Sequence, residues 1–212
     1  MDQQSKPCRD IVAIGGSAGG LEAIEALLMR LPPDLPAAIL IVLHRPPERA
    51  SFLPQILARL TRMRVVVARQ GQRLEHATCY LGEPNGHLTI GPGPTFDLLP
   101  DGFYRAHNVD ALFHSLAQHA GPRVIGVILS GMLKDGSLGL KAIKEGGGLA
   151  MAQSPDEALF KDMPRNAIEH DGLIDFVGPI NELAEEICRQ VAVASSSTSV
   201  SDGDRGGSRP VL

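Results

Sequence analysis

The strongest constraint on the fold is a glycine-rich segment that joins an apolar run to an amphipathic one. Residues 11–14 are Ile-Val-Ala-Ile, a composition typical of a buried strand, and residues 15–20 are Gly-Gly-Ser-Ala-Gly-Gly. From Leu21 onward, apolar residues recur at helical spacing. A strand, a tight turn and a helix in this order form the unit from which parallel sheets are built. Glycines on both sides of Ser17 would leave its hydroxyl unobstructed.

The alternation of strand and helix patterns continues along the chain. Residues 37–43, 124–129 and 149–153 are almost continuously apolar, as in central parallel strands, and shorter β segments are predicted at 65–68, 79–81, 87–90 and 96–99. Helices are predicted at 52–60, 109–119, 135–143 and 180–191, with further helical segments after Asp156 and Met163. The pattern predicts an α/β fold: one doubly wound, mostly parallel sheet with helices on both faces.

Composition favours one domain. The 212 residues are 43% hydrophobic, enough for one substantial core. We expect a flexible N-terminus at 1–9, the folded domain at 10–193, and a disordered tail at 194–212, where serine, glycine and aspartate predominate.

Charge and residue spacing exclude several classes. A net charge of −4 argues against nucleic acid as a partner, and no segment predicts membrane insertion or a secretory signal, so a cytoplasmic protein is expected. The three cysteines lack C-x-x-C spacing, which favours a reducing compartment. The histidines lack ligand spacing, so neither a metal nor a cofactor is predicted; those considered are His107, His114, His119 and His170.

The glycine-rich turn could also bind a nucleotide, but both phosphate-binding patterns fail. Ser17 occupies the second glycine position of the dinucleotide fingerprint, and no lysine follows as in a phosphate loop. Nucleotide binding is therefore the last-ranked alternative.

Three residues follow predicted strands at the same edge of the sheet: Ser17, His44 and Asp135. A serine hydroxyl needs a base to become a nucleophile, an imidazole can take the proton, and a carboxylate can orient the imidazole. Taken singly, His44 could simply end a strand, and Asp135 with Gly136 could be a turn or helix cap. Together they predict a serine hydrolase site. The chain order Ser-His-Asp differs from that of α/β-hydrolases.

At these residues the chain resembles the catalytic domain of the CheB family of chemotaxis protein-glutamate methylesterases. The resemblance runs from about Asp10 to Val191. It includes the turn at Ser17, the His-x-Pro sequence at His44, residues 65–71, and the segment 124–132 that leads into Asp135-Gly136.

The resemblance implies hydrolysis of glutamyl methyl esters on chemoreceptor helices with release of methanol, and in some members deamidation of receptor glutamines. It places the nucleophile, base and aspartate on Ser17, His44 and Asp135, and an oxyanion-hole N–H on Met132, with further backbone support from Ala18. Chemoreceptor cytoplasmic helices are the implied partner, together with a separate response regulator.

The sequence departs from the family at three points. Ala18 stands where the family often has threonine, and Leu133 replaces a glycine of the family's Thr-Gly-Met-Gly-x-Asp-Gly signature, which begins here with Ser130. The family's usual N-terminal receiver domain is not in this sequence. These departures leave open a catalytically impaired docking module in a chemosensory pathway. It predicts receptor binding without methanol release.

Overall fold

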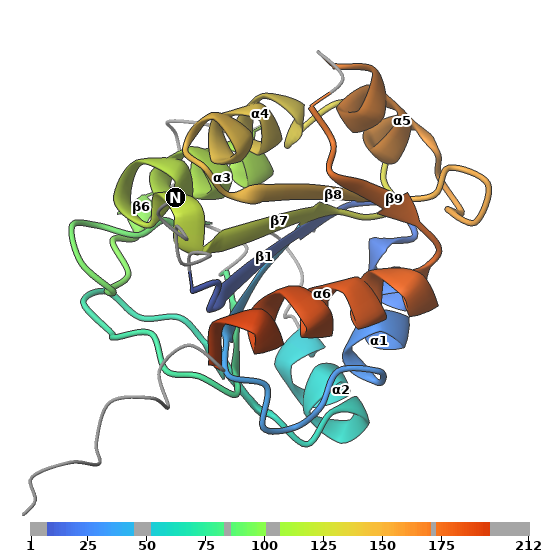
Figure 1. Ribbon diagram of the computed structural model, residues 1–212. Helices are drawn as coiled ribbons and strands as arrows, with labels where there is room; N and C mark the ends of the chain where they lie inside the picture. The colour runs from blue at the N-terminus through green and yellow to red at the C-terminus, as the bar shows by residue number, and fades with distance from the viewer. Residues whose placement is uncertain (1–7, 45–51, 83–85, 101–106, 171–172, 196–212) are drawn as a thin grey trace, which may run out of the picture.

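Figure 1 shows the computed structural model, in which one twisted sheet lies between two layers of helices. The structure describes residues 8–44, 52–82, 86–100, 107–170 and 173–195. Seven strands pair in parallel in the order β3-β4-β2-β1-β7-β8-β9. They are β1 (Ile11–Gly16), β2 (Ala38–Leu43), β3 (Arg64–Val67), β4 (Thr78–Leu81), β7 (Val124–Ile128), β8 (Leu149–Gln153) and β9 (Phe176–Gly178). The predicted doubly wound α/β fold is confirmed.

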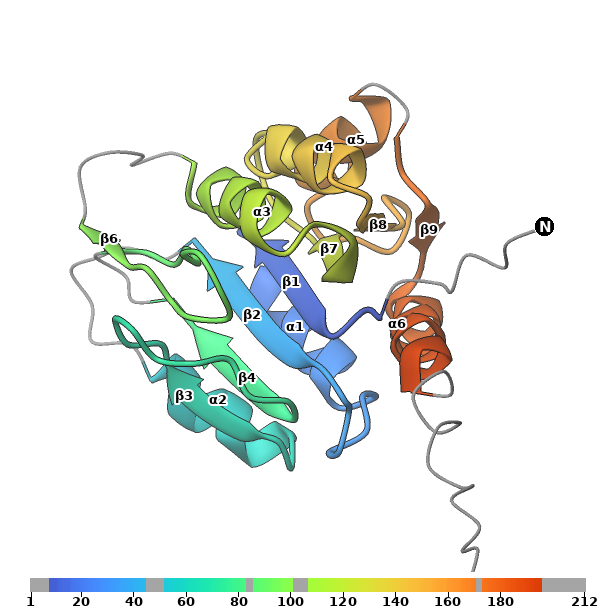
Figure 2. The ribbon, with the colours of Figure 1, turned by 60° about the vertical axis from the view of Figure 1, so that its left-hand side comes forward.

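Helices cover both faces of the sheet, as Figures 1 and 2 show. One layer contains α1 (Gly20–Leu28), α2 (Leu53–Leu60) and α6 (Ile180–Ser195), and the other α3 (Asn108–His119), α4 (Ser137–Glu145) and α5 (Asp162–Glu169). Successive strand side chains point to opposite faces. Val12 and Ile14 of β1 therefore pack in the first core, and Ile11 and Ala13 in the second.

The order of the strands determines where a site can form. The chain passes from β1 to β2 on one side, and later enters β7 on the other side of β1. Gly16 of β1 is in register with Leu43 of β2, and Gly15 with Ile128 of β7. Residues that follow these three strands therefore meet at one edge of the sheet, where open α/β sheets bind their ligands.

Two local predictions differ from the structure. The helix expected after Asp156 is wrong, because residues 154–160 make only a single turn before the backbone N–H of Phe160 bonds the Ser130 hydroxyl instead. Strand β9 was not predicted, since only three residues pair with β8. The segments expected near residues 87–90 and 96–99 contribute a short antiparallel pair, β5 (Gly86–His87) and β6 (Leu99–Pro100), and an isolated bridge between Ile90 and Phe96.

Residues 1–7 of the N-terminus expected at 1–9, residues 196–212 of the tail expected at 194–212, and Pro46 of the His-x-Pro sequence lie outside the described residues. Within the described residues, no helix combines the length and the apolar composition needed to cross a lipid bilayer.

Candidate active site

Ser17 lies where β1 turns into α1. Its N–H donates to the carbonyl of Ser130 at 3.0 Å, and its own carbonyl accepts the N–H of Gly20, the first residue of α1, at 2.8 Å. Gly19 between them has φ of 66°, a left-handed conformation that favours glycine. The turn therefore holds Ser17 at the strand end beside the N-terminus of α1, with its side chain partly exposed.

His44 and Asp135 are in direct contact at the same edge. The N–H of His44 bonds the carbonyl of Gly16 at 3.1 Å, which fixes the residue after β2 beside the end of β1. His44 Nε2 lies 2.7 Å from Asp135 Oδ2. The Asp135 carboxylate is almost fully buried and accepts two N–H groups of α3, from Val109 at 2.9 Å and Asp110 at 3.0 Å. The histidine–aspartate pair expected from sequence thus exists, although 91 residues separate its members.

One of the two ring nitrogens of His44 remains available for proton transfer. Because Nε2 is held by Asp135, Nδ1 is the atom available to take a proton from a nucleophile. The Ser17 hydroxyl makes no hydrogen bond to the His44 ring or to any other described side chain. A catalytic hydrogen bond that forms only with substrate present is common in hydrolases.

Several backbone N–H groups near Ser17 have no acceptor among the described residues. The N–H groups of Ala18 and Met132 donate to no acceptor among the described residues, whereas those of Ser17 and Gly131 are already bonded to carbonyl oxygens. Preorganised N–H donors are what a tetrahedral oxyanion requires. The N–H groups of Ala18 and Met132, like that of Gly19, are thus available to bind an anion.

The Ser130–Gly131 segment holds the two loops of the site together. The Ser130 hydroxyl donates to the carbonyl of Ala18 at 2.9 Å and accepts the N–H of Phe160 at 3.0 Å. A Cβ on Gly131 would lie 2.0 Å from Met163 Sδ and 3.0 Å from Ser17 Cβ, so a larger residue there would displace Met163 and crowd the Ser17 side chain. Gln153 Oε1 also accepts the Ser130 N–H at 2.9 Å.

A second buried carboxylate lies next to Asp135. Asp110, in the first turn of α3, accepts the N–H of Gly139 at 2.7 Å. Burial raises the pKa of the Asp110 carboxyl; the Gly139 hydrogen bond lowers this pKa, and the negative charge of Asp135 raises it further. The His107 ring, about half exposed, lies 3.5 Å from Asp110 and 3.9 Å from Asp135.

Among the described residues, these three side chains come nearest to forming a metal site. His107, Asp110 and Asp135 offer one nitrogen and two carboxylate oxygens within 4.8 Å of one another. Each carboxylate oxygen, however, already faces a donor: the backbone N–H groups described above, His44 or His107. Hydrogen bonding within the protein therefore accounts for the cluster.

Apolar side chains are exposed around Ser17. Met132 and Leu133 are 50% and 74% exposed, and Leu159 and Phe160 are 69% and 38% exposed. A Cβ added to Gly19 would lie 3.0 Å from Leu159 Cβ, so this side chain borders the nucleophile turn. We call these four residues the apolar rim. A rim of this kind suits a protein substrate with an apolar face.

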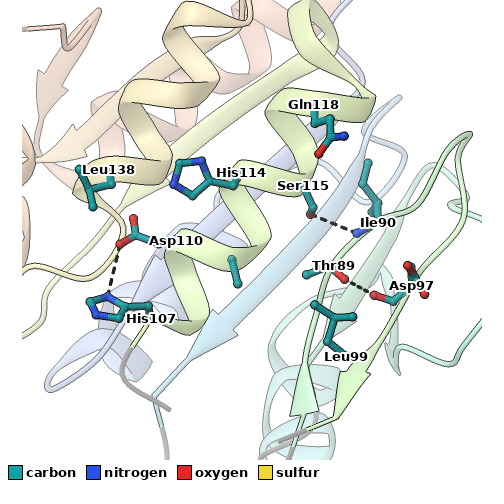
Figure 3. Close-up of a pocket in the computed structure, with 11 residues that line it drawn as sticks. Thr89, Ile90, Asp97, Leu99, His107, Asp110, His114, Ser115, Gln118 and Leu138 are labelled. Carbon is teal, nitrogen blue, oxygen red and sulfur yellow. Dashed lines mark hydrogen bonds and ion pairs between the residues drawn. The ribbon is translucent and has the colours of Figure 1, made fainter. Parts of the chain in front are cut away.

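A separate cavity of about 470 Å³ lies between α3 and the segment that contains β5 and β6 (Figure 3). Its walls include Thr89 and Asp97 on the β side and, opposite them, His107 just before α3 and Asp110 and His114 within α3. The cavity therefore reaches His107 and Asp110, the residues that lie next to Asp135.

The sequence analysis named Ser17, His44 and Asp135 but missed the groups that hold them. Asp110, Ser130 and Gln153 act through hydrogen bonds to backbone N–H or carbonyl groups of distant segments. No motif marks such contacts. The sequence carried only a weak signal for these three residues: each is polar, but lies in a segment whose other residues are expected to be buried.

The fold and these residues define a class of protein: a parallel α/β domain with a serine, histidine and aspartate of the kind used by serine hydrolases at the carboxyl edge of its sheet. Comparison with known families identifies the family within this class. Residues 12–187 match the CheB methylesterase family, and the chain belongs to that family.

Curated relatives and a solved structure agree with this assignment. The chain is 37% identical over 188 residues to a protein-glutamate methylesterase/protein-glutamine glutaminase of Burkholderia pseudomallei, covering 86% of this chain and 51% of the relative. It is 36% identical over 193 residues to that of Geobacillus kaustophilus, covering 88% and 55%. The chain thus spans about half the length of the curated relatives it matches. The crystal structure of the Thermotoga maritima CheB methylesterase catalytic domain matches with a TM-score of 0.78 and 27% identity, covering 86% of this chain and 99% of that one.

Proposed function

We propose that this chain is a serine hydrolase that removes methyl groups from glutamyl methyl esters of chemoreceptors and also deamidates receptor glutamines. The observation that carries the proposal is the buried Asp135 carboxylate, 2.7 Å from His44, at the strand edge where Ser17 is presented. The names of the relatives, protein-glutamate methylesterase/protein-glutamine glutaminase, support the substrate class.

The proposed reaction uses these groups as follows. Ser17 Oγ attacks the ester carbonyl while His44 Nδ1 takes its proton, and Asp135 stabilises the imidazolium. The oxyanion is held by the N–H groups of Ala18 and Met132. Collapse of the intermediate expels methoxide, which leaves as methanol with the proton from His44. Water, activated by the same imidazole, then hydrolyses the acyl-enzyme to the free glutamate. A glutamine substrate would follow the same steps with ammonia as the leaving group.

The apolar rim supports a protein substrate. A receptor helix with an apolar face could contact Met132, Leu133, Leu159 and Phe160 while its modified side chain reaches Ser17. The partner is then the cytoplasmic helices of a chemoreceptor, and the domain acts in the cytoplasm. Residues 10–193 form the catalytic unit, and a separate response regulator is the second partner we propose.

The test is methanol release from purified receptor methylated on glutamate. Ser17→Ala should remain folded and lose about 10⁴-fold or more in turnover, because one member of a catalytic triad is removed. The matched control is Ser154→Ala, since Ser154 lies after β8 and its hydroxyl accepts only the nearby N–H of Asp156. A serine-directed fluorophosphonate should label Ser17 and not the Ser17→Ala variant, as intact mass would show. Receptor binding without methanol release, or full activity in folded Ser17→Ala, would overturn the proposal.

A further inference from the structure

Helices α3 and α4 meet at their N-termini, directly behind Asp135. Figure 3 shows Asp110 on the first turn of α3, with Leu138 at the start of α4 beside it. A Cβ on Gly139 would lie 2.5 Å from Phe113 Cβ and 3.0 Å from Asp110 Cα, so glycine allows the two helices to approach this closely.

Neither helix caps its own N-terminus. The residue before α3, His107, makes no side-chain cap hydrogen bond, and the residue before α4, Gly136, has no side chain. The first N–H groups of a helix have no partner within the helix and need an acceptor when they are buried. Val109, Asp110 and Gly139 are buried, so the acceptors for their N–H groups must come from elsewhere in the protein.

The two helices supply each other's caps. Asp135, just before α4, accepts the N–H groups of Val109 and Asp110 in α3. Asp110, in α3, accepts the N–H of Gly139 in α4. The arrangement is reciprocal, and one of its two carboxylates is the group that holds His44. A displacement of α4 relative to α3 would therefore move Asp135.

We propose that Asp110 is a positioning residue for the active site: by capping α4 it fixes the N-terminal turn of that helix, and with it the Asp135 carboxylate that orients His44. This inference rests on the proposed function of the same site. Asp110 touches no reacting atom in this scheme. It acts through Gly139 and the α3–α4 junction.

What Gly139 needs from Asp110 is a hydrogen-bond acceptor. Two carboxylates side by side repel each other, and burial together with Asp135 raises the pKa of the Asp110 carboxyl, which favours its uncharged form. An amide oxygen accepts an N–H equally well without adding a second negative charge. Asparagine at this position should therefore preserve the cap, whereas alanine should remove it.

The experiment compares Asp110→Ala, Asp110→Asn and the wild-type protein. Asp110→Ala should lower kcat by about 100-fold with KM unchanged, because a small displacement of a catalytic group is costly while substrate contacts stay intact. Asp110→Asn should keep most of the wild-type kcat. The matched control is Asp10→Asn: Asp10 accepts two hydrogen bonds from Arg123 beside the first residue of β1, far from the site, and its loss should leave kcat unchanged.

A second readout does not depend on any activity. The proton between His44 Nε2 and Asp135 should give a downfield NMR signal, assigned by its loss in His44→Gln. We expect this signal in the wild type and in Asp110→Asn, and expect it to be lost or shifted in Asp110→Ala. If the wild-type protein releases no methanol, the proposed function fails, and the NMR signal still decides whether Asp110 positions Asp135.

Two results would overturn the inference. One is a folded Asp110→Ala with the wild-type NMR signal and kcat. The other is a folded Asp110→Asn that has lost both, which would show that the charge of Asp110 is required. Because Asp110→Asn retains the hydrogen-bond acceptor, its kcat and NMR signal test the inference even where Asp110→Ala fails to fold.

Discussion

At the scale of single residues, Leu133 is the most unusual position in the site. It has φ of 69°, a left-handed conformation, and its side chain is 74% exposed. Its carbonyl accepts Asn166 Nδ2 at 2.6 Å, and Asp135 two residues later still contacts His44. Leu133 is the position where the sequence replaces a glycine of the family signature. The described backbone adopts the left-handed conformation with leucine in place.

This conformation predicts that Leu133→Gly stabilises the protein. A left-handed residue with a Cβ costs about 1–2 kcal/mol, and the greater chain entropy of an unfolded glycine offsets roughly 0.5–1 kcal/mol of that. We expect a net gain of about 0.5–1 kcal/mol in the free energy of unfolding, measured by urea denaturation. Leu133→Ala keeps the strain and serves as the control. Equal stability of the glycine and alanine variants would contradict the prediction.

The positions of Ser17, His44 and Asp135 were predictable because each follows an apolar run, and a parallel sheet brings such positions together. Their hydrogen-bond partners were not predictable. Val109 and Asp110 hold Asp135 through backbone N–H groups, which every residue has, so no residue type signals the contact. Only the packing of α3 against the start of α4 decides which N–H groups reach the carboxylate.

At the scale of elements, the site depends on loops that are held together by one side chain. Ser130, after β7, bonds the turn between β1 and α1 through Ala18 and the loop between β8 and α5 through Phe160. The role of the loop between β8 and α5 was not predictable from the sequence, and this loop was expected to contain a helix. Strand β9 was missed for a related reason: three residues are too few to show periodicity.

Removing the Ser130 hydroxyl should therefore affect both stability and activity. Ser130→Ala loses two hydrogen bonds and should lower the free energy of unfolding by about 1–3 kcal/mol. Turnover should fall roughly 10-fold, because the nucleophile turn and the free N–H of Met132 are no longer held in register. Ser130→Thr keeps the hydroxyl and should retain activity in the methanol assay. Equal activity of the alanine and threonine variants would show that the hydroxyl does not hold the loops.

At the scale of the whole molecule, the fold was predictable because the central strands are buried on both faces. Strands β1, β2 and β7 have almost no polar residues, and this continuity indicated a covered parallel sheet. The same burial determines how the cysteines react. Cys79 lies in β4 with no exposed surface, its Sγ 3.8 Å from Met63 Sδ, whereas Cys8 is exposed and Cys188 is partly buried.

Cys79 should therefore report on unfolding of the entire sheet. Burial raises the pKa of the Cys79 thiol from 9.0 to about 12, so at pH 8 only on the order of 10⁻⁴ of it is the reactive thiolate. With an aromatic disulfide reagent at pH 8, Cys8 should react first, Cys188 more slowly, and Cys79 only when the protein unfolds. In a urea series, the labelling of Cys79, followed by peptide mass, should coincide with the loss of circular dichroism. Because the raised pKa favours the neutral thiol in the folded state, its contribution to stability is complete below pH 9 and is lost as pH rises towards 12. Labelling of Cys79 in native buffer at the rate of Cys8 would show instead that the β3–β4 edge opens independently of the remaining sheet.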